Sequence, residues 1–166
     1  AFMETTIINI TSVQKVEITG TYKHVVNETV ANQTIADTQL AGGKYEDMVF
    51  ENVTFENCTI QASLFLKTKF IDCRFKNCNF SFAKFVSCNL VACTFENCHF
   101  CITNSLTCNF LSCTFLDNTW KLGTQRDNKL IDCYLGDQTY FHMDVDGENN
   151  DLLSSFEDAP LSDQAA

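Results

Sequence analysis

The chain has 166 residues, a net charge of −10 and a pI near 4.5. It is long enough for one domain with a hydrophobic core. The charge argues against electrostatic binding to nucleic acid or to an anionic membrane surface, and no run of eighteen apolar residues is present that would span a bilayer. We therefore expect no membrane span within this segment, although a longer chain could carry spans on either side of it.

The first 44 residues are expected to form an N-terminal β cap and an entry segment. Stretches 6–11 and 15–22 are rich in Ile and Val, as β-strands are. A stack of strands must cover its first unpaired edge, and this segment would supply that cover. The pair Gly42-Gly43 then marks the start of a different pattern.

A five-residue repeat runs from about residue 45 to residue 120. Every fifth residue from Phe50 is large and apolar in fourteen of fifteen cases, and eleven of the fifteen Phe residues of the chain lie there. Two residues before each of them stands a smaller residue, which is Cys in eight units. Neither an α-helix, with its period of about 3.6, nor a strand, with its period of about 2, produces this pattern.

The repeat predicts a four-sided β-helix, an all-β fold. Five residues make one side of a square coil, and four sides make a coil of about twenty residues. The large residue points to the axis, the small residue fits beside it, and the other three positions face water. Coils stack at the strand spacing of about 4.8 Å, so residues twenty apart lie above one another. We expect about four coils, with a core of Phe55, Phe65, Phe70, Phe75, Phe80, Phe85, Phe95, Phe100, Phe110 and Phe115.

The repeat is interrupted in two places. Ser105 occupies an axial position and should leave a local defect or a bend. Residues 121–129 are expected to form a polar loop around Gly123. The phase resumes in residues 130–143, which should complete a last partial coil. Residues 144–166 are acidic and poor in apolar residues, which is typical of a flexible tail.

Nine of the ten cysteines take the small inward position, and Cys101 does not. Free Cys packs as a small apolar residue, and we interpret the inward cysteines in this way. Columns of Cys at the strand spacing fall within the Cα range of a disulfide, but parallel side chains suit its torsion poorly. No CxxC with a matching His pair and no catalytic pair at a plausible spacing occurs, so we expect no catalytic residue, no metal, no cofactor and no enzyme activity.

Six Asn-x-Ser/Thr motifs are present, more than the composition gives by chance. In the repeat frame three of them point outward, where a glycan could attach. The excess favours an extracellular or vesicle-lumen location with N-glycans, against an Asn- and Thr-rich repeat that carries no modification. The candidate glycosylation sites are Asn9, Asn27, Asn32, Asn52, Asn57 and Asn79.

The repeat resembles the pentapeptide-repeat family, whose members form a right-handed quadrilateral β-helix. Units 55–59 and 70–75, and the approach 32–45, are also similar to the large luminal loop of the synaptic vesicle glycoprotein 2 family. That resemblance implies a domain between two membrane spans. In that family the open edge of the β-helix accepts a strand from botulinum neurotoxin, with added contacts from a glycan, so the resemblance also implies a toxin receptor. The family's last coil carries a sequon, where this chain has 112–114 as Ser-Cys-Thr.

Three functions remain open. The first is a non-catalytic luminal or extracellular recognition domain of a membrane glycoprotein, which binds a protein partner through a glycosylated outer face or an exposed edge strand. The second is an acidic soluble protein that mimics DNA and binds a DNA-handling enzyme, as the resemblance to bacterial pentapeptide proteins implies. The third is a spacer or assembly module without a ligand. Nucleic acid is not expected as a partner in any of them.

A partner that adds a strand needs free backbone groups, which only the terminal coils keep. The N-terminal end has a candidate cover, so we expect the C-terminal end to bind. Residues 131–135 would take this role if they form the outermost strand. Otherwise the predicted edge consists of Cys113, Thr114, Phe115, Leu116, Asp117 and Asn118.

Overall fold

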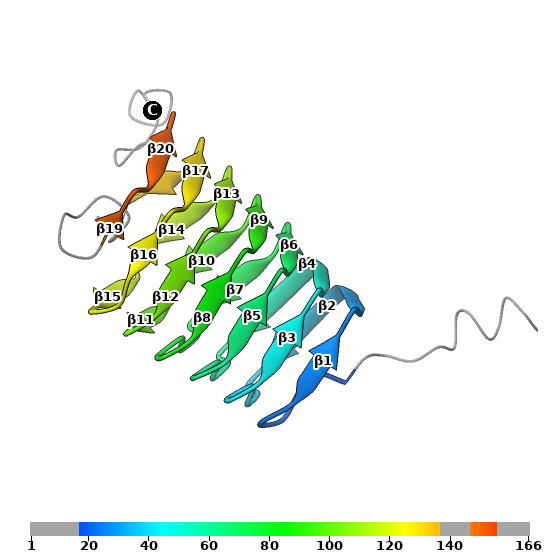
Figure 1. Ribbon diagram of the computed structural model, residues 1–166. Helices are drawn as coiled ribbons and strands as arrows, with labels where there is room; N and C mark the ends of the chain where they lie inside the picture. Colours follow the sequence, from blue (N-terminus) through cyan, green and yellow to red (C-terminus); the bar gives the residue numbers. More distant parts are fainter. Residues whose placement is uncertain (1–16, 137–146, 156–166) are drawn as a thin grey trace, which may run out of the picture.

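The chain winds into a right-handed, four-sided β-helix (Figure 1). The computed structural model describes residues 17–136 and 147–155, with side chains for all of these except 147 and 148. Strands twenty residues apart pair in parallel, so Phe55 lies against Phe75 and Phe75 against Phe95. Residues 17–136 therefore make about six coils, more than the four predicted.

The four sides of the coil are named here by their strands. Side A is a seven-stranded sheet of β1 (His24–Val26), β3 (Lys44–Glu46), β5 (Leu64–Leu66), β8 (Lys84–Val86), β12 (Asn104–Leu106), β16 (Gln125–Arg126) and β19 (Gly147–Glu148). Side D is built from isolated bridges through Gln39, Thr59, Asn79 and His99, and from the pair β11 (His99–Cys101) and β15 (Thr119–Lys121).

Sides B and C share an eleven-stranded sheet, because two long strands cover both of them: β2 (Thr29–Ala36) and β4 (Val49–Glu56). Side B continues with β6 (Lys69–Ile71), β9 (Asn89–Val91), β13 (Asn109–Leu111), β17 (Lys129–Ile131) and β20 (Asp151–Leu153). Side C continues with β7 (Arg74–Lys76), β10 (Thr94–Glu96), β14 (Thr114–Leu116) and β18 (Tyr134–Leu135).

The corners of the coil explain why a five-residue unit is needed. Every fifth residue from 22 to 132 has a positive φ, between 49° and 69°, and the chain turns there from one side to the next. Asn or Asp stands at about half of these corners, since their short polar side chains tolerate the left-handed conformation better than most residues. Only four residues lie between one corner and the next, which is too few for a helix, so each side is a short strand.

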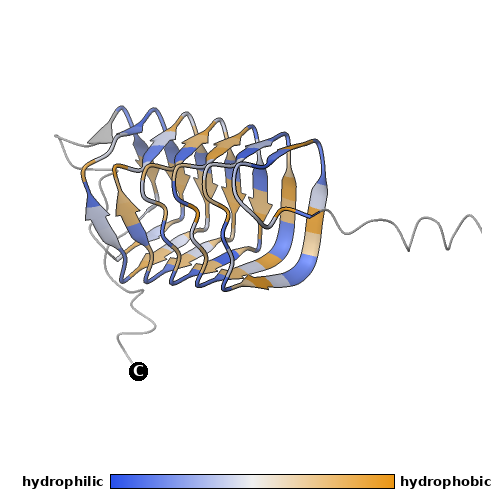
Figure 2. Ribbon diagram, turned by 90° about the horizontal axis from the view of Figure 1, so that it is seen from below, coloured by the Kyte–Doolittle hydropathy of each residue, from blue (hydrophilic) through white to orange (hydrophobic). Residues whose placement is uncertain are grey.

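Stacked aromatic rings fill the axis of the coils. All ten predicted core Phe residues are buried. The rings of Phe55 and Phe75 lie 4.8 Å apart and nearly parallel, and those of Phe50 and Phe70 lie 5.0 Å apart. Rings on adjacent sides meet edge to face, as Phe70 does with Phe75 at 5.5 Å. Figure 2 shows hydrophobic residues recurring at the same place in successive coils. Such contacts stabilise the stack beyond the buried area alone.

The coils extend beyond the predicted bounds at both ends. β1 already pairs in register with β3, so residues 17–44 form coils rather than a separate cap. Stretch 6–11 lies outside the described residues. The predicted loop 121–129 contains β16, which pairs with β12. Within the predicted tail, β19 and β20 pair with β16 and β17. No helix among the described residues has the length and hydropathy to cross a membrane.

Candidate binding surface on the outer faces of the coils

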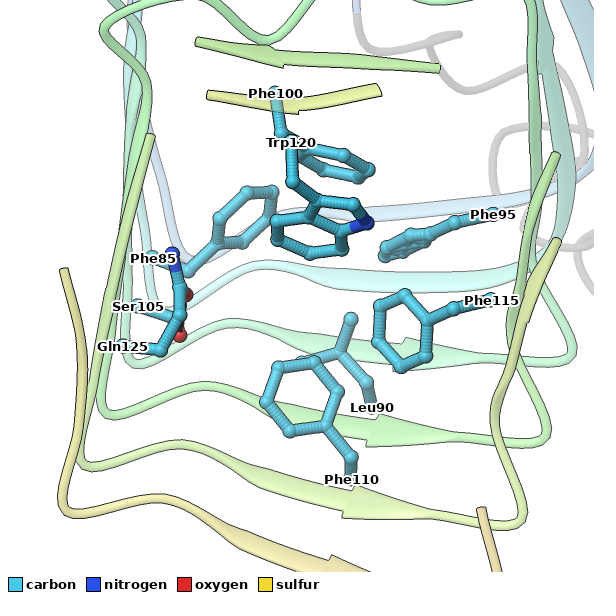
Figure 3. A pocket seen from close by; sticks show the side chains of 9 residues that line it. All are labelled: Phe85, Leu90, Phe95, Phe100, Ser105, Phe110, Phe115, Trp120 and Gln125. Atoms are coloured by element: carbon cyan, nitrogen blue, oxygen red, sulfur yellow. Dashed lines mark hydrogen bonds between the residues drawn. The ribbon is translucent and has the colours of Figure 1, made fainter. Parts of the chain in front are cut away.

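The interior of the coils offers no room for a substrate. One cavity of about 20 Å³ is lined by the bonded pair Ser105 and Gln125 on one side and by Leu90, Trp120 and the rings of five Phe residues (Figure 3). That volume accommodates about one water molecule, far less than the few hundred Å³ of a ligand pocket. Among the described residues there is also no group of three or more His, Cys, Asp or Glu side chains that could hold a metal ion. A binding surface within the described coils must therefore lie on their outer faces or in the first coil, where Ile18, Gln33 and Ile35 help to line a hollow of about 300 Å³.

The polar residues around this cavity hold the axis together. Ser105 Oγ donates a hydrogen bond to Gln125 Oε1, and Gln125 Nε2 donates to the carbonyl oxygen of Thr103 at 2.8 Å. Asn128 Nδ2 donates to the Ser105 carbonyl oxygen at 3.1 Å. Because these buried polar atoms find partners, the pairing of β12 continues through the position where the sequence predicted a defect or a bend. Gln125 and Asn128 were missed as structural residues, although the five-residue reading, continued past residue 120, places both inward.

The inward cysteines act as hydrogen-bond donors between coils. Cys73 Sγ donates to the carbonyl oxygen of Phe50, 23 residues earlier, at 3.3 Å. Thr103 Oγ1 makes the same contact to the Phe80 carbonyl oxygen at 2.7 Å. The position therefore selects a small side chain that can donate, which corrects the interpretation of these cysteines as merely apolar. All nine inward cysteines make this bond: Cys58, Cys73, Cys78, Cys88, Cys93, Cys98, Cys108, Cys113 and Cys133.

Six of the inward thiols have a raised pKa, namely Cys58, Cys73, Cys78, Cys88, Cys93 and Cys113, whereas hydrogen bonding to Cys88 lowers the pKa of Cys108 and hydrogen bonding to Cys113 lowers the pKa of Cys133. The ten cysteines are free thiols, and Cys101 is the one that is partly exposed. Hydrogen bonding to Cys93 and then burial raise the pKa of the Cys73 thiol far above its usual range. Because the thiolate is the nucleophile and the metal ligand, a neutral buried thiol performs neither role.

The predicted edge strand does not lie at an edge. β14, which holds Thr114 to Leu116, pairs with β10 on one side and with β18 on the other. Ile131 is likewise covered, because β17 pairs with β20. The alternative edge 131–135 is confirmed in part, because Tyr134 and Leu135 form β18, the last strand of side C among the described residues. The physical reason is that the chain continues past the predicted end: apolar Leu152 packs on the core and carries β20 into a stretch whose acidic composition predicted a tail.

The outward Asn residues of the sequons form ladders along the corners. Asn52 Nδ2 donates to Asn32 Oδ1 at 3.0 Å, and Asn57 Nδ2 donates to Asp37 Oδ1 at 3.0 Å. Asn79 Oδ1 instead accepts bonds from the backbone and side chain of Ser81. Asn27 is also exposed, and Asn9 lies outside the described residues. These side chains thus contribute to coil stacking, and their glycosylation stays a prediction.

The coils themselves are close to neutral. Residues 17–136 contain twelve carboxylates and ten Lys or Arg residues, whereas residues 137–166 contain eight carboxylates and no Lys or Arg. Between residues 61 and 90 five basic residues stand with one carboxylate, Asp72. The ion pairs found in the described part of the chain join Glu46 to His24 at 3.7 Å and to Lys44 at 4.0 Å. Among the described residues, the basic side chains of the middle coils therefore have no carboxylate within 4.0 Å.

Comparison with known proteins places the repeat in a known family. The model for pentapeptide repeats matches residues 65–100, with eight copies. No curated protein matches the chain. Among solved structures, the plasmid-mediated fluoroquinolone resistance protein QnrB1 (trypsin-treated) has a TM-score of 0.41 at 13% identity, covering 82% of this chain and 92% of its own. Rfr23, a pentapeptide repeat protein of the cyanobacterium Cyanothece 51142, has a TM-score of 0.37 at 10% identity, covering 95% and 96%.

Scores and identities this low carry no information on function. The matched repeats agree with the geometry described above, in which each five-residue unit forms one side of a coil and each corner has a positive φ. The coils continue on both sides of the matched stretch, from β1 to β20. Paired residues are twenty apart throughout, except that β19 and β20 lie twenty-two residues after their partners. Residues 65–100 are therefore pentapeptide repeats, and the coils on both sides continue them with the same geometry.

Proposed function

We propose that this protein is a non-catalytic binding module that recognises a protein partner with the outer faces of its coils. The proposal rests on the contrast between the interior and the surface of the coils. Stacked rings fill the axis, whereas the outer surface exposes large apolar side chains such as Phe82 and Leu122. Among the described residues, Lys67, Lys69 and Lys84 on that surface form no ion pair. Unlike an enzyme, such a rod offers flat, rigid sides, and rigid sides lower the entropic cost of association.

Cross-linking mass spectrometry on protein from its native source tests this proposal. Lysines of the middle coils, Lys67, Lys69 and Lys84, should react with a second protein that remains bound through purification. The same lysines should be protected from acetylation in the complex and reactive in the isolated chain. Retention of a small molecule or turnover of a substrate, with no bound protein, would contradict the proposal.

A DNA mimic that binds a DNA-handling enzyme is one finer candidate. The net charge of −10 favours it. Because residues 137–166 carry most of that charge, a mimic of this kind would need them at its interface. Binding to the enzyme should then fall steeply with salt and be competed by duplex DNA, and removal of residues 156–166, with three carboxylates, should weaken it. Affinity independent of salt would exclude this candidate.

A luminal recognition domain, similar to that of the synaptic vesicle glycoprotein 2 family, is the other finer candidate. The six sequons favour it. On protein from the native source, peptide mapping after glycosidase treatment in heavy-oxygen water should mark Asn27, Asn32, Asn52 or Asn57 as deamidated. Unmodified Asn at every sequon would remove the reason for a luminal location and leave the binding function standing.

A further inference from the structure

One corner of the coil differs in chemistry from the other three. At the corner between sides D and A, the residues with positive φ are Tyr22, Gly42, Ala62, Phe82, Ile102 and Leu122. At the remaining corners the same position holds Asn, Asp, Ser, Thr or Lys, with Ala92 as the exception between 27 and 132. We call the row Phe82, Ile102 and Leu122 the apolar ridge. It occupies three successive coils, and in Figure 1 it lies at the turns that lead into β8, β12 and β16.

The fold itself gives no reason for these residues. Phe82, Ile102 and Leu122 have φ of 63°, 52° and 55°, a conformation that bulky residues and above all β-branched Ile rarely adopt. Their side chains are 52%, 36% and 58% exposed, so the strain is not offset by burial in the core. Asn would be better at each position. Backbone strain kept at exposed apolar residues indicates selection for an external contact.

The ridge leads into a side with further apolar residues. On side A the outward residues Leu64, Leu66, Val86 and Leu106 are partly buried, and Lys84 and Asn104 stand between the ridge and the last two of these. Exposed apolar residues with polar neighbours are common in protein interfaces.

The charged residues beside the ridge are basic. From residue 59 to residue 126, sides D and A, the corner between them and the corner after side A contain Lys67, Lys84, Lys121 and Arg126 and no carboxylate, in a chain with 21 carboxylates and 11 basic residues. Asp117 stands farther away, at the corner between sides C and D. Within the described residues, no carboxylate lies within 4.0 Å of Lys67, Lys84 or Lys121. Glu46 and Asp47 precede this region and Asp127 follows it.

We infer that the apolar ridge and side A bind an acidic segment of a partner protein, with large apolar side chains set against the ridge and carboxylates set against Lys67, Lys84 and Lys121. This inference rests on the proposed binding function and names its surface and the chemistry of its partner. A second copy of this chain fits less well, because a two-fold contact through the ridge would bring the same basic rim to both sides. A membrane surface is opposed by the net charge of −10.

Fluorescence anisotropy with the full chain tests the inference. The probe is a labelled synthetic peptide with Leu at helical spacing and Glu elsewhere, and its counterpart carries Lys in place of Glu. The wild type should bind the Glu peptide and not the Lys peptide. The variant Phe82→Asn/Ile102→Asn/Leu122→Asn should bind at least about tenfold more weakly. It should also melt at or above the wild-type temperature, because Asn relieves the strain at each corner.

Two further variants serve as controls. Asp72→Asn/Ala92→Asn/Ser112→Asn places Asn at the corner between sides B and C and should bind as the wild type does. The charge reversal Lys67→Glu/Lys84→Glu should weaken binding of the Glu peptide and create binding of the Lys peptide. A ridge variant that keeps its affinity for the Glu peptide overturns the inference, and so does one that melts well below the wild type, since the ridge would then be part of the core.

A second copy of the chain or a lipid surface bound at the ridge would give different experimental results. A wild-type dimer in sedimentation that the ridge variant lacks would identify a second copy as the occupant. Binding to phosphatidylserine vesicles that the ridge variant loses would identify a lipid surface. Either result overturns the inference. If native-source cross-linking retains a partner that the ridge variant still binds, the ridge inference fails and the proposed function stands. If the ridge binds the peptide but no protein is retained, the proposed function fails instead.

Discussion

At the scale of single residues, the inward position of each five-residue unit links one coil to the one before it. Its side chain donates to a carbonyl oxygen 23 residues earlier, and Cys, Ser, Thr and Asn all serve in this role. A backbone N–H group twenty residues earlier can donate a hydrogen bond to the same side chain. Met48 N donates to Thr68 Oγ1 in this way, and Cys98 N donates to Asn118 Oδ1. The inward Cys, Ser, Thr and Asn residues therefore satisfy backbone groups of the neighbouring coil, which Val53 and Ala83 in the same position cannot do.

Substitution of Cys78 tests this role. Its Sγ donates to the Phe55 carbonyl oxygen at 3.4 Å. Cys78→Ala removes the donor and should lower the free energy of unfolding by about 1 kcal/mol. Cys78→Ser keeps a donor of similar size and should lie within about 0.5 kcal/mol of the wild type. Urea denaturation measures both, with Cys101→Ser as a control outside the inward position. If Ser proves less stable than Ala, the side chain acts by apolar packing alone.

At the scale of the strands, the turn into β16 depends on one glycine. Gly123 has a φ of +104°, and a Cβ there would lie 2.4 Å from the Thr103 carbonyl oxygen and 2.9 Å from its nitrogen. Backbone atoms cannot yield as a flexible side chain does. The glycine that the sequence predicted to mark a loop therefore permits close contact between two coils, and it lets the chain pass from side D to side A without a break in register.

Gly123→Ala should therefore destabilise the protein by about 2 kcal/mol or more, through strain and steric conflict. Gly136→Ala is the matched control: φ is not positive there, and the added Cβ would meet only the side chain of Tyr134 among its near neighbours. Thermal melting followed by circular dichroism compares the two. Equal melting temperatures would show that the segment around Gly123 adjusts freely, as an independent loop would.

The axial pair between β12 and β16 should show strong coupling. Ser105→Ala leaves Gln125 Oε1 buried without its donor and should cost about 1–3 kcal/mol. Gln125→Leu leaves the Ser105 hydroxyl and the Thr103 carbonyl oxygen without Gln125 and should cost a similar amount. The double variant Ser105→Ala/Gln125→Leu should cost clearly less than the sum of the two, because both polar partners are then absent. Additive losses in a double-mutant cycle would mean that the two side chains do not depend on each other.

At the scale of the whole molecule, the coils form a one-dimensional stack in which each coil contacts its neighbours. Asn77 and Asn97 occupy the same corner in successive coils and are joined by a hydrogen bond of 2.6 Å. Twenty residues that begin and end at the same corner can therefore be deleted without changing which residues of the later coils point inward. The fold depends on the twenty-residue register between coils.

Deletion of residues 77–96 should leave a folded, shorter β-helix, because residues 97–116 then stack on residues 57–76 in the original phase. Its β-sheet signal should persist, with a lower melting temperature from the loss of one coil. Deletion of residues 77–79 is the control: it removes fewer residues but moves every later large axial residue, such as Phe85, into a corner position. We expect this control to lose cooperative melting. Similar melting curves for the two deletions would contradict the stacking described here.

The sequence alone determined the repeat, the inward Phe and Cys positions and the four-sided coil, because a five-residue period is fixed by local geometry and by the need to bury one large side chain on each side. It did not determine where the coils begin and end. Gln125, Asn128 and Asn150 are polar residues whose hydrogen-bond partners lie twenty to twenty-three residues away in the chain, and only the coiling brings them within reach. The predicted edge at Thr114 to Leu116 failed for the same reason, since later coils cover it. The apolar ridge was equally hidden, because residues 82, 102 and 122 share a corner and a basic rim only after the chain has coiled. Local pattern encodes the shape of each coil, whereas long-range hydrogen bonds decide how many coils stack and which outer residues meet.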